Sequence, residues 1–224
     1  DTLTKIMIVS QDMGQQHELE NLANTDALTG LFNKRYFEKI MEIRLASPIL
    51  QADSIVDGEG VRAVLWTQGC GHKCLGCHNP STHSFDDGID IEEVKAQIDS
   101  LEGQDGITLS GGDPMYQVDA CLELAKYIKS KKMNIWCYTG FTYENLLKLG
   151  EANPKIIELL KQIDVLVDGP FILDKKSYDC VFRGSTNQRI IDPKESLKKK
   201  KVCLVEKYYP KDKKKNNKRE RMYI

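Results

Sequence analysis

Three cysteines, Cys70, Cys74 and Cys77, lie within eight residues of the chain. Their spacing is Cys-x-x-x-Cys-x-x-Cys, and the glycines around them let the backbone wrap closely around a bulky group. Three thiolates can each bind one iron of a 4Fe–4S cluster and leave the fourth iron open to an outside ligand. A structural zinc ion is the alternative, with His72 or His78 as its fourth ligand, although zinc sites more often use two separated cysteine pairs.

The chain has seven cysteines, and an odd number argues against a fully paired disulfide framework. The other four are scattered, and we expect Cys121, Cys137 and Cys203 to be small buried hydrophobic residues. The chain starts at Asp1, without Met or a basic-then-apolar leader, so no secretory signal is expected and a fragment or the end of a longer reading frame is indicated. In a cytoplasmic chain, clustered cysteines indicate metal binding or catalysis.

The composition excludes several classes of protein. The 224 residues contain 41% hydrophobic residues and carry a net charge of -1, which is ordinary for a soluble globular protein. No apolar run approaches the roughly 20 residues that span a bilayer, so a membrane protein is not expected. A nucleic-acid partner is not expected either. Residues 192–224 hold 13 basic and five acidic side chains, which predicts a solvated basic tail, with an interaction tail as the alternative.

The elements that must position the cysteines alternate between strand and helix. Strands are expected at 61–68, 107–109, 134–138 and 164–167, and helices at 90–101, 118–128, 142–149 and 154–163. This alternation predicts an α/β fold with right-handed crossovers and a parallel sheet.

Four unusual loops follow these four strands directly. Because ligands bind at the carboxyl ends of parallel strands, we expect the loops to meet at one rim and form a binding site. The loops are Gly69-Cys70, Ser110-Gly111-Gly112-Asp113, Thr139-Gly140 and Asp168-Gly169.

The chain from about residue 53 to 192 resembles the activating proteins of anaerobic ribonucleoside-triphosphate reductase, within the radical S-adenosylmethionine (SAM) superfamily. The resemblance covers roughly 140 residues, with the matching segments in family order. These are Val56-Asp57-Gly58-Glu59-Gly60, Cys70 to Pro80, Leu109 to Pro114, Trp136 to Gly140, Val165 to Gly169 and Arg183 to Gln188.

This resemblance implies a partial (β/α) barrel of radical SAM type, with parallel strands and a short helical segment before it. It implies that Cys70, Cys74 and Cys77 ligate a 4Fe–4S cluster whose open iron is chelated by SAM. The residues expected to contact SAM are Gly76, Cys77, His78, Gly111, Gly112, Asp113, Thr139 and Asp168. Asp168 is also interpreted as a possible cation ligand or turn residue. Gly76 departs from the superfamily, where an aromatic residue commonly precedes the third cysteine.

The implied activity is that of an oxidoreductase that cleaves SAM reductively and generates a glycyl radical. Its expected partners are the large subunit of the anaerobic ribonucleoside-triphosphate reductase and a one-electron donor such as flavodoxin. One alternative is an activase of another glycyl-radical enzyme, of the pyruvate formate-lyase type. A non-catalytic zinc module is the other.

The beginning of the chain carries a second, shorter resemblance. Leu22 to Phe37 is similar to the opening of a diguanylate cyclase (GGDEF) domain, but the catalytic loop of that family never follows. We therefore predict three parts: a helical, non-catalytic GGDEF-like fragment at 1–45, the activase domain at 46–192 and the basic tail at 193–224.

Overall fold

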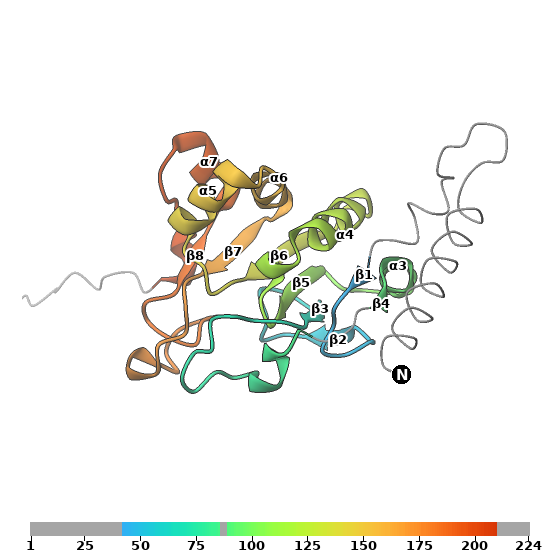
Figure 1. Cartoon of the computed structure of the whole chain (residues 1–224), viewed down its shortest axis with the longest axis horizontal. Coiled ribbons are helices and arrows are strands. Elements are labelled where there is room, and N and C mark those ends of the chain that lie inside the picture. Colours follow the sequence, from blue (N-terminus) through green and yellow to red (C-terminus); the bar gives the residue numbers. More distant parts are fainter. Residues whose placement is uncertain (1–41, 86–88, 210–224) are drawn as a thin grey trace, which may run out of the picture.

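The computed structural model describes residues 42–85 and 89–209, and in these ranges the chain forms an α/β fold (Figure 1). A six-stranded sheet has the order β2-β3-β5-β6-β7-β8, and a separate pair joins β1 to β4. The strands are β1 (Glu42–Ile43), β2 (Gln51–Ser54), β3 (Arg62–Thr67), β4 (Ile89–Asp90), β5 (Gly106–Gly111), β6 (Asn134–Tyr138), β7 (Val165–Asp168) and β8 (Arg189–Ile191). The α-helices are α3 (Ile91–Asp99), α4 (Val118–Ser130), α5 (Tyr143–Ala152), α6 (Lys155–Gln162) and α7 (Pro193–Lys199).

The four central strands of the sheet are parallel and lie in chain order, while β2 and β8 run antiparallel at its two edges. Their register sets Leu65, Leu109, Cys137 and Leu166 in one row across the sheet, and all four are at most 1% exposed. Strands buried on both faces have nearly continuous apolar sequences, which explains why these four were readable from the sequence.

Helices α3 to α6 pack beside one another along one side of the sheet (Figure 1). Helix α3 begins at Asp90, whose carboxylate accepts a hydrogen bond from Glu92 N at 3.0 Å, as an N-cap residue does. Leu124 of α4 and Leu159 of α6 are fully buried in the core that these helices share with the strands. The helices thus cover the apolar row of the sheet.

A smaller cluster covers the other side of the sheet, where Trp136 packs with Val167, Ile190 and Tyr208. The guanidinium of Arg62 lies 5.6 Å from the centre of the Trp136 ring and is completely buried. Burial lowers the pKa of Arg62 to about 10. Its hydrogen bonds to neighbours on β5 and β6 hold the three strands together.

All eight predicted strands and helices of 61–167 are confirmed, with shifts of a few residues at their ends. The helical prediction for 1–45 is wrong at its end, because Glu42–Ile43 pairs with β4 and Leu45 bridges to Thr67. Short strands such as β8 were missed because three residues carry too little periodicity to be recognised.

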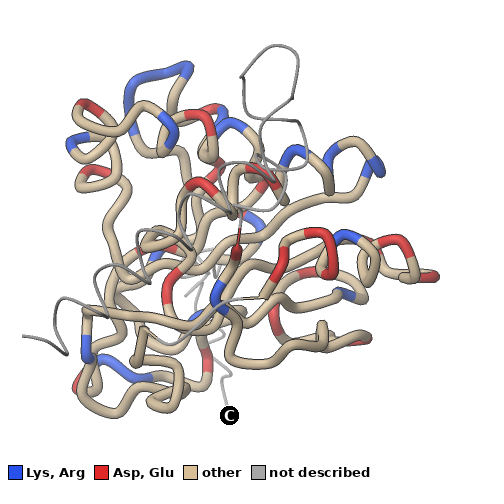
Figure 2. Tube along the Cα trace, turned by 45° about the vertical axis from the view of Figure 1, so that its right-hand side comes forward, with Lys and Arg blue, Asp and Glu red and all other residues tan. Residues whose placement is uncertain are grey.

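Both predicted domain boundaries fall within packed structure. On the carboxyl side, α7 is followed by residues that return to the sheet, where Val205 N donates to Ile190 O at 2.9 Å. Basic and acidic residues are interspersed along the described trace (Figure 2). The GGDEF-like stretch, Leu22 to Phe37, lies outside the described residues. Among the described helices, none has the length and apolarity required to span a membrane.

Candidate functional site

The three clustered cysteines line a cavity of about 130 Å³ at the carboxyl ends of the parallel strands. The loops that follow β3, β5, β6 and β7 all contribute to its wall, which confirms that the four loops meet at one rim. Besides the cysteines, the lining residues are His72, His78, Asn79, Ser110, Gly111, Gly112, Tyr138, Thr139, Gly140, Gly169, Phe171 and Gln188.

The cysteine loop is held mainly by its own backbone. Cys70 N donates to His83 O at 3.3 Å and Cys77 N donates to Cys74 O at 3.1 Å, so the loop turns back on itself. Cys70 is 7% exposed, and burial together with the nearby charge of Asp113 raises its pKa. All three thiols are free of disulfides. Within 42–85 and 89–209, no three His, Cys, Asp or Glu side chains converge to hold a single metal ion.

The two glycines after β5 are required by close packing. Gly111 has a φ of +101°, and a Cβ atom there would lie 2.4 Å from Thr67 O. A Cβ on Gly112 would lie 2.6 Å from Gly69 O. Such distances exclude any side chain, so the Gly-Gly pair lets the loops after β3 and β5 touch through their backbones. Both glycines line the cavity.

Asp113 does not line the cavity but lies beneath it, fully buried. Its Oδ2 atom accepts hydrogen bonds from His72 Nε2 at 2.8 Å, Thr139 Oγ1 at 3.0 Å and Gly140 N at 2.9 Å. Its Oδ1 atom accepts from Met115 N at 2.9 Å. Both carboxylate oxygens are therefore committed to protein donors.

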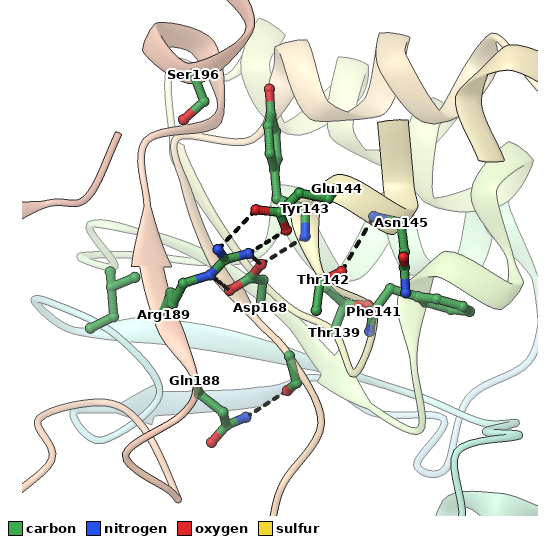
Figure 3. A network of polar contacts seen from close by, with 12 residues as sticks. Thr139, Phe141, Thr142, Tyr143, Glu144, Asn145, Asp168, Gln188, Arg189 and Ser196 are labelled. Atoms are coloured by element: carbon green, nitrogen blue, oxygen red, sulfur yellow. Dashed lines mark hydrogen bonds and ion pairs between the residues drawn. The ribbon is translucent and has the colours of Figure 1, made fainter. Parts of the chain in front are cut away.

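Asp168 is the last residue of β7 and is also fully buried away from the cavity lining. Its carboxylate accepts from Arg189 Nε at 3.0 Å and from Tyr143 N, the first residue of α5, at 2.7 Å. Figure 3 shows Arg189 between Asp168 and Glu144. The hydrogen bonds that Arg189 donates to Asp168 and Glu144 hold the pKa of its guanidinium above the usual range.

A larger cavity of about 410 Å³ adjoins the first, and the two share His78, Asn79, Ser110, Tyr138, Phe171 and Gln188. His78 packs against Phe171 at 5.0 Å between ring centres, at the boundary between the cavities. Arg183 reaches the larger cavity, donates to Gln188 O at 3.0 Å and stacks on Tyr209. The cysteine loop therefore opens on a chamber large enough for an organic ligand.

Comparison with known proteins shows which family has this arrangement of cysteines and loops. A family model described as a 4Fe-4S single cluster domain matches residues 56–191, which include every loop of the cavity. The anaerobic ribonucleoside-triphosphate reductase-activating protein of Haemophilus influenzae is 36% identical over 146 residues, which cover 61% of this chain and 90% of the relative. The chain belongs to this activating-protein family.

Relatives with the same name occur in other organisms. The protein of Escherichia coli K12 is 35% identical over 144 residues, covering 60% of this chain and 90% of its own length. That of Enterobacteria phage T4 is 34% identical over 143 residues, covering 60% of this chain and 86% of its own length. The family membership supports an iron–sulfur cluster as the cofactor that the three cysteines bind.

The predicted cofactor contacts divide between two places. Cys77, His78, Gly111, Gly112 and Thr139 line the cavity, whereas Gly76, Asp113 and Asp168 do not. Contact between these residues and SAM stays a prediction. The expected burial of Cys121 and Cys137 is confirmed, since both are 0% exposed and burial raises the pKa of both thiols. Cys203 is only partly buried.

Sequence reasoning missed Arg189 and Glu144. Arg189 lies opposite Asp168 in the antiparallel pairing of β7 with β8, so its role depends on a strand that the sequence did not reveal. Glu144 is a first-turn residue of α5, where an acidic side chain is ordinary. The strand pairing brings Arg189 to Asp168, and the position of α5 brings Glu144 to the same guanidinium.

Proposed function

We propose that this protein is a radical SAM activase that generates a glycyl radical on an anaerobic ribonucleoside-triphosphate reductase. The observation that carries the proposal is the convergence of three free thiols and four strand-end loops on one cavity, in a chain of the activating-protein family. A reduced 4Fe–4S cluster bound there would supply one electron for cleavage of SAM to methionine and a 5′-deoxyadenosyl radical, which takes a hydrogen atom from a glycine Cα of the partner.

The residues fit such a cluster. In a cubane each thiolate binds its own iron, so the three thiols must surround a cavity rather than meet at one point. Zinc would need a closed set of four ligands. Among the described residues, no three His, Cys, Asp or Glu side chains converge on one point, as such a set would require.

The chain's own residues would do the positioning. Cys70, Cys74 and Cys77 would hold the cluster, and the backbone at Gly111 and Gly112 would receive the amino-acid end of SAM. His78 and Thr139 lie on the cavity wall within reach of the same ligand. Asp113 and Asp168 would act from beneath, because their oxygens are taken up by loop contacts.

The finer architecture is part of this proposal. The chain-order sheet β3-β5-β6-β7 with helices on one side supports a partial (β/α) barrel of radical SAM type. We assign the activase to 46–192, as a catalytic unit of the kind that activates pyruvate formate-lyase, with Glu42–Ile43 and the residues around Val205 packed against it. The flanking segments, 1–45 and 193–224, would be non-catalytic. An anaerobic cytoplasm and a flavodoxin-type electron donor complete the proposal.

The test is anaerobic reconstitution followed by incubation with dithionite and SAM. The wild-type chain is expected to release 5′-deoxyadenosine and to produce a glycyl-radical EPR signal on the reductase. Cys74→Ser is expected to abolish both, whereas the matched control Cys203→Ser retains them. A wild-type chain that binds iron and yet forms no 5′-deoxyadenosine would contradict the proposal. A radical formed on pyruvate formate-lyase instead of the reductase would reassign the partner.

A further inference from the structure

A side-chain contact beneath the cysteine loop has no part in the chemistry proposed above. His72 Nε2 lies 2.8 Å from Asp113 Oδ2, and the two side chains are 18% and 1% exposed. Because a carboxylate only accepts hydrogen bonds, the histidine nitrogen is the donor. His72 stands between the first two cysteines of the loop, so the contact ties this part of the loop to the segment after β5.

The His72 ring is closely packed. It packs edge-on against Phe141, with 4.5 Å between ring centres, and more loosely against Tyr116 at 5.8 Å. A Cβ atom on Gly140 would lie 2.5 Å from the ring, so the backbone after β6 touches the imidazole directly. Aromatic packing and the hydrogen bond therefore restrain the same ring from two directions.

Asp113 connects the three loops that build the cavity wall. Its backbone N donates to Gly69 O at 3.1 Å, and its carboxylate accepts from Thr139 and Gly140 after β6 as well as from His72. Among the described residues, His72 is the side chain that forms an ion pair with the Asp113 carboxylate. A buried carboxylate that loses a donor is strongly disfavoured, so loss of the His72 donor would disturb all three loops.

We propose that His72 and Asp113 form a positioning pair that clamps the cysteine loop against the Gly111-Gly112 loop. The pair keeps the thiol of Cys70 sheltered and holds the cluster loop at a set distance from the SAM loop. His72 acts by holding the cysteine loop in place and contacts neither the cluster nor SAM. The inference rests on the proposed function for its purpose, but the clamp itself exists without any bound cofactor.

The decisive measurement uses the full-length metal-free chain under anaerobic conditions. Alkylation of each cysteine is followed by mass spectrometry, with Cys121 and Cys137, both 0% exposed, as internal reporters of unfolding. His72→Met and His72→Gln are similar in length, but only glutamine can donate to Asp113. His83→Phe is the matched control, because the His83 Nε2 atom is buried without a hydrogen-bond partner.

Loss of the clamp is expected to raise the alkylation rate of Cys70 about tenfold in His72→Met, through local opening of the loop. In His72→Gln and His83→Phe the rate is expected to stay within about threefold of the wild type. If Cys121 and Cys137 also react quickly in His72→Met, the variant is unfolded, and His72→Phe, which keeps the ring packing without the donor, takes its place. Equal Cys70 rates in the wild type and in the donor-free variant overturn the clamp.

The cofactor-loaded chain supplies a second readout. The change that SAM causes in the EPR spectrum of the reduced cluster is expected to diminish in His72→Met and to return in His72→Gln. Failure of the wild type to form 5′-deoxyadenosine would remove the proposed function and leave the alkylation result standing. Unchanged alkylation with an active wild type would remove only the clamp.

Discussion

Asp113 and Asp168 lie at the carboxyl ends of two parallel strands but are stabilised differently. Each follows or ends a parallel strand, each is fully buried, and both were expected to contact SAM. Asp113 is surrounded by two backbone amides, a hydroxyl and a histidine. Asp168 faces the guanidinium of Arg189. The first carboxylate joins the loops of the cavity, and the second joins the sheet edge to α5.

The difference shows what each carboxylate is for. An ion pair with Arg189 gives Asp168 a strong partner on β8, at the antiparallel edge of the sheet, and the pair supports the fold there. Asp113 depends on several weaker donors from separate loops. The stabilisation of its carboxylate is therefore divided among the hydrogen bonds that shape the site. A buried carboxylate beneath a cavity can therefore serve the site without entering it.

The largest expected effect is at the ion pair. Asp168→Asn removes the buried one of the two charges that Arg189 faces, and breaking this ion pair from one side should lower the free energy of unfolding by about 3 kcal/mol. Chemical denaturation measures this loss. Asp90→Asn is the control, since asparagine also caps a helix and the stability should barely change. An Asp168→Asn loss no larger than that of Asp90→Asn would erase the contrast between the two carboxylates.

Asp113→Asn should cost less, about 2 kcal/mol, because an amide group replaces one oxygen that accepts hydrogen bonds. The lost acceptor affects the loops of the cavity rather than the sheet edge. Cys70, 7% exposed in the wild type, should therefore become more accessible to alkylation, and it should remain sheltered in Asp168→Asn. Equal accessibility of Cys70 in the two variants would show that both carboxylates support the site alike.

Removal of a single neutral hydrogen-bond donor should lower the free energy of unfolding by less than either carboxylate substitution. Thr139→Val removes the hydroxyl that donates to Asp113 at 3.0 Å, and the loss should be about 1 kcal/mol in the same denaturation experiment. Thr139→Ser retains the hydroxyl and should restore most of this stability. If the serine variant is as unstable as the valine variant, packing of the methyl group matters more than the hydrogen bond.

The smallest effect concerns the outer member of the Asp168 network. Hydrogen bonds from Arg189 lower the pKa of Glu144 below 4.5, its ordinary value. This contribution is present above the unfolded-state pKa and is lost as the pH falls through the folded-state pKa. Glu144 is 52% exposed, so solvent screening limits the contribution to about 0.5 kcal/mol.

Glu144→Gln should consequently show a slightly weaker loss of stability than the wild type as the pH falls from about 5 to about 3. The check is a series of denaturation curves across this range for both proteins. Parallel pH profiles would place the pH sensitivity elsewhere in the molecule.

Much of the fold was readable from the chain, for reasons specific to its strands. β3, β5, β6 and β7 are buried on both faces, so their sequences are mostly apolar runs between polar loops. The edge strands β2 and β8 are short and partly exposed, and they left no such pattern. Whether Asp113 and Asp168 line the cavity was not readable for a related reason, because a side chain that follows a strand can turn into the cavity or beneath it.

By itself, the sequence determined which residues could do chemistry and which strand ends would present them. The spacing of Cys70, Cys74 and Cys77 and the Gly111-Gly112 pair are local features, set by covalent order and backbone freedom. Only the tertiary structure decided which donors each buried carboxylate receives, since His72 and Asp113 are 41 residues apart and Asp168 and Arg189 are 21 apart. Hydrogen bonds between such distant residues form where packed loops happen to meet, and that depends on the whole fold.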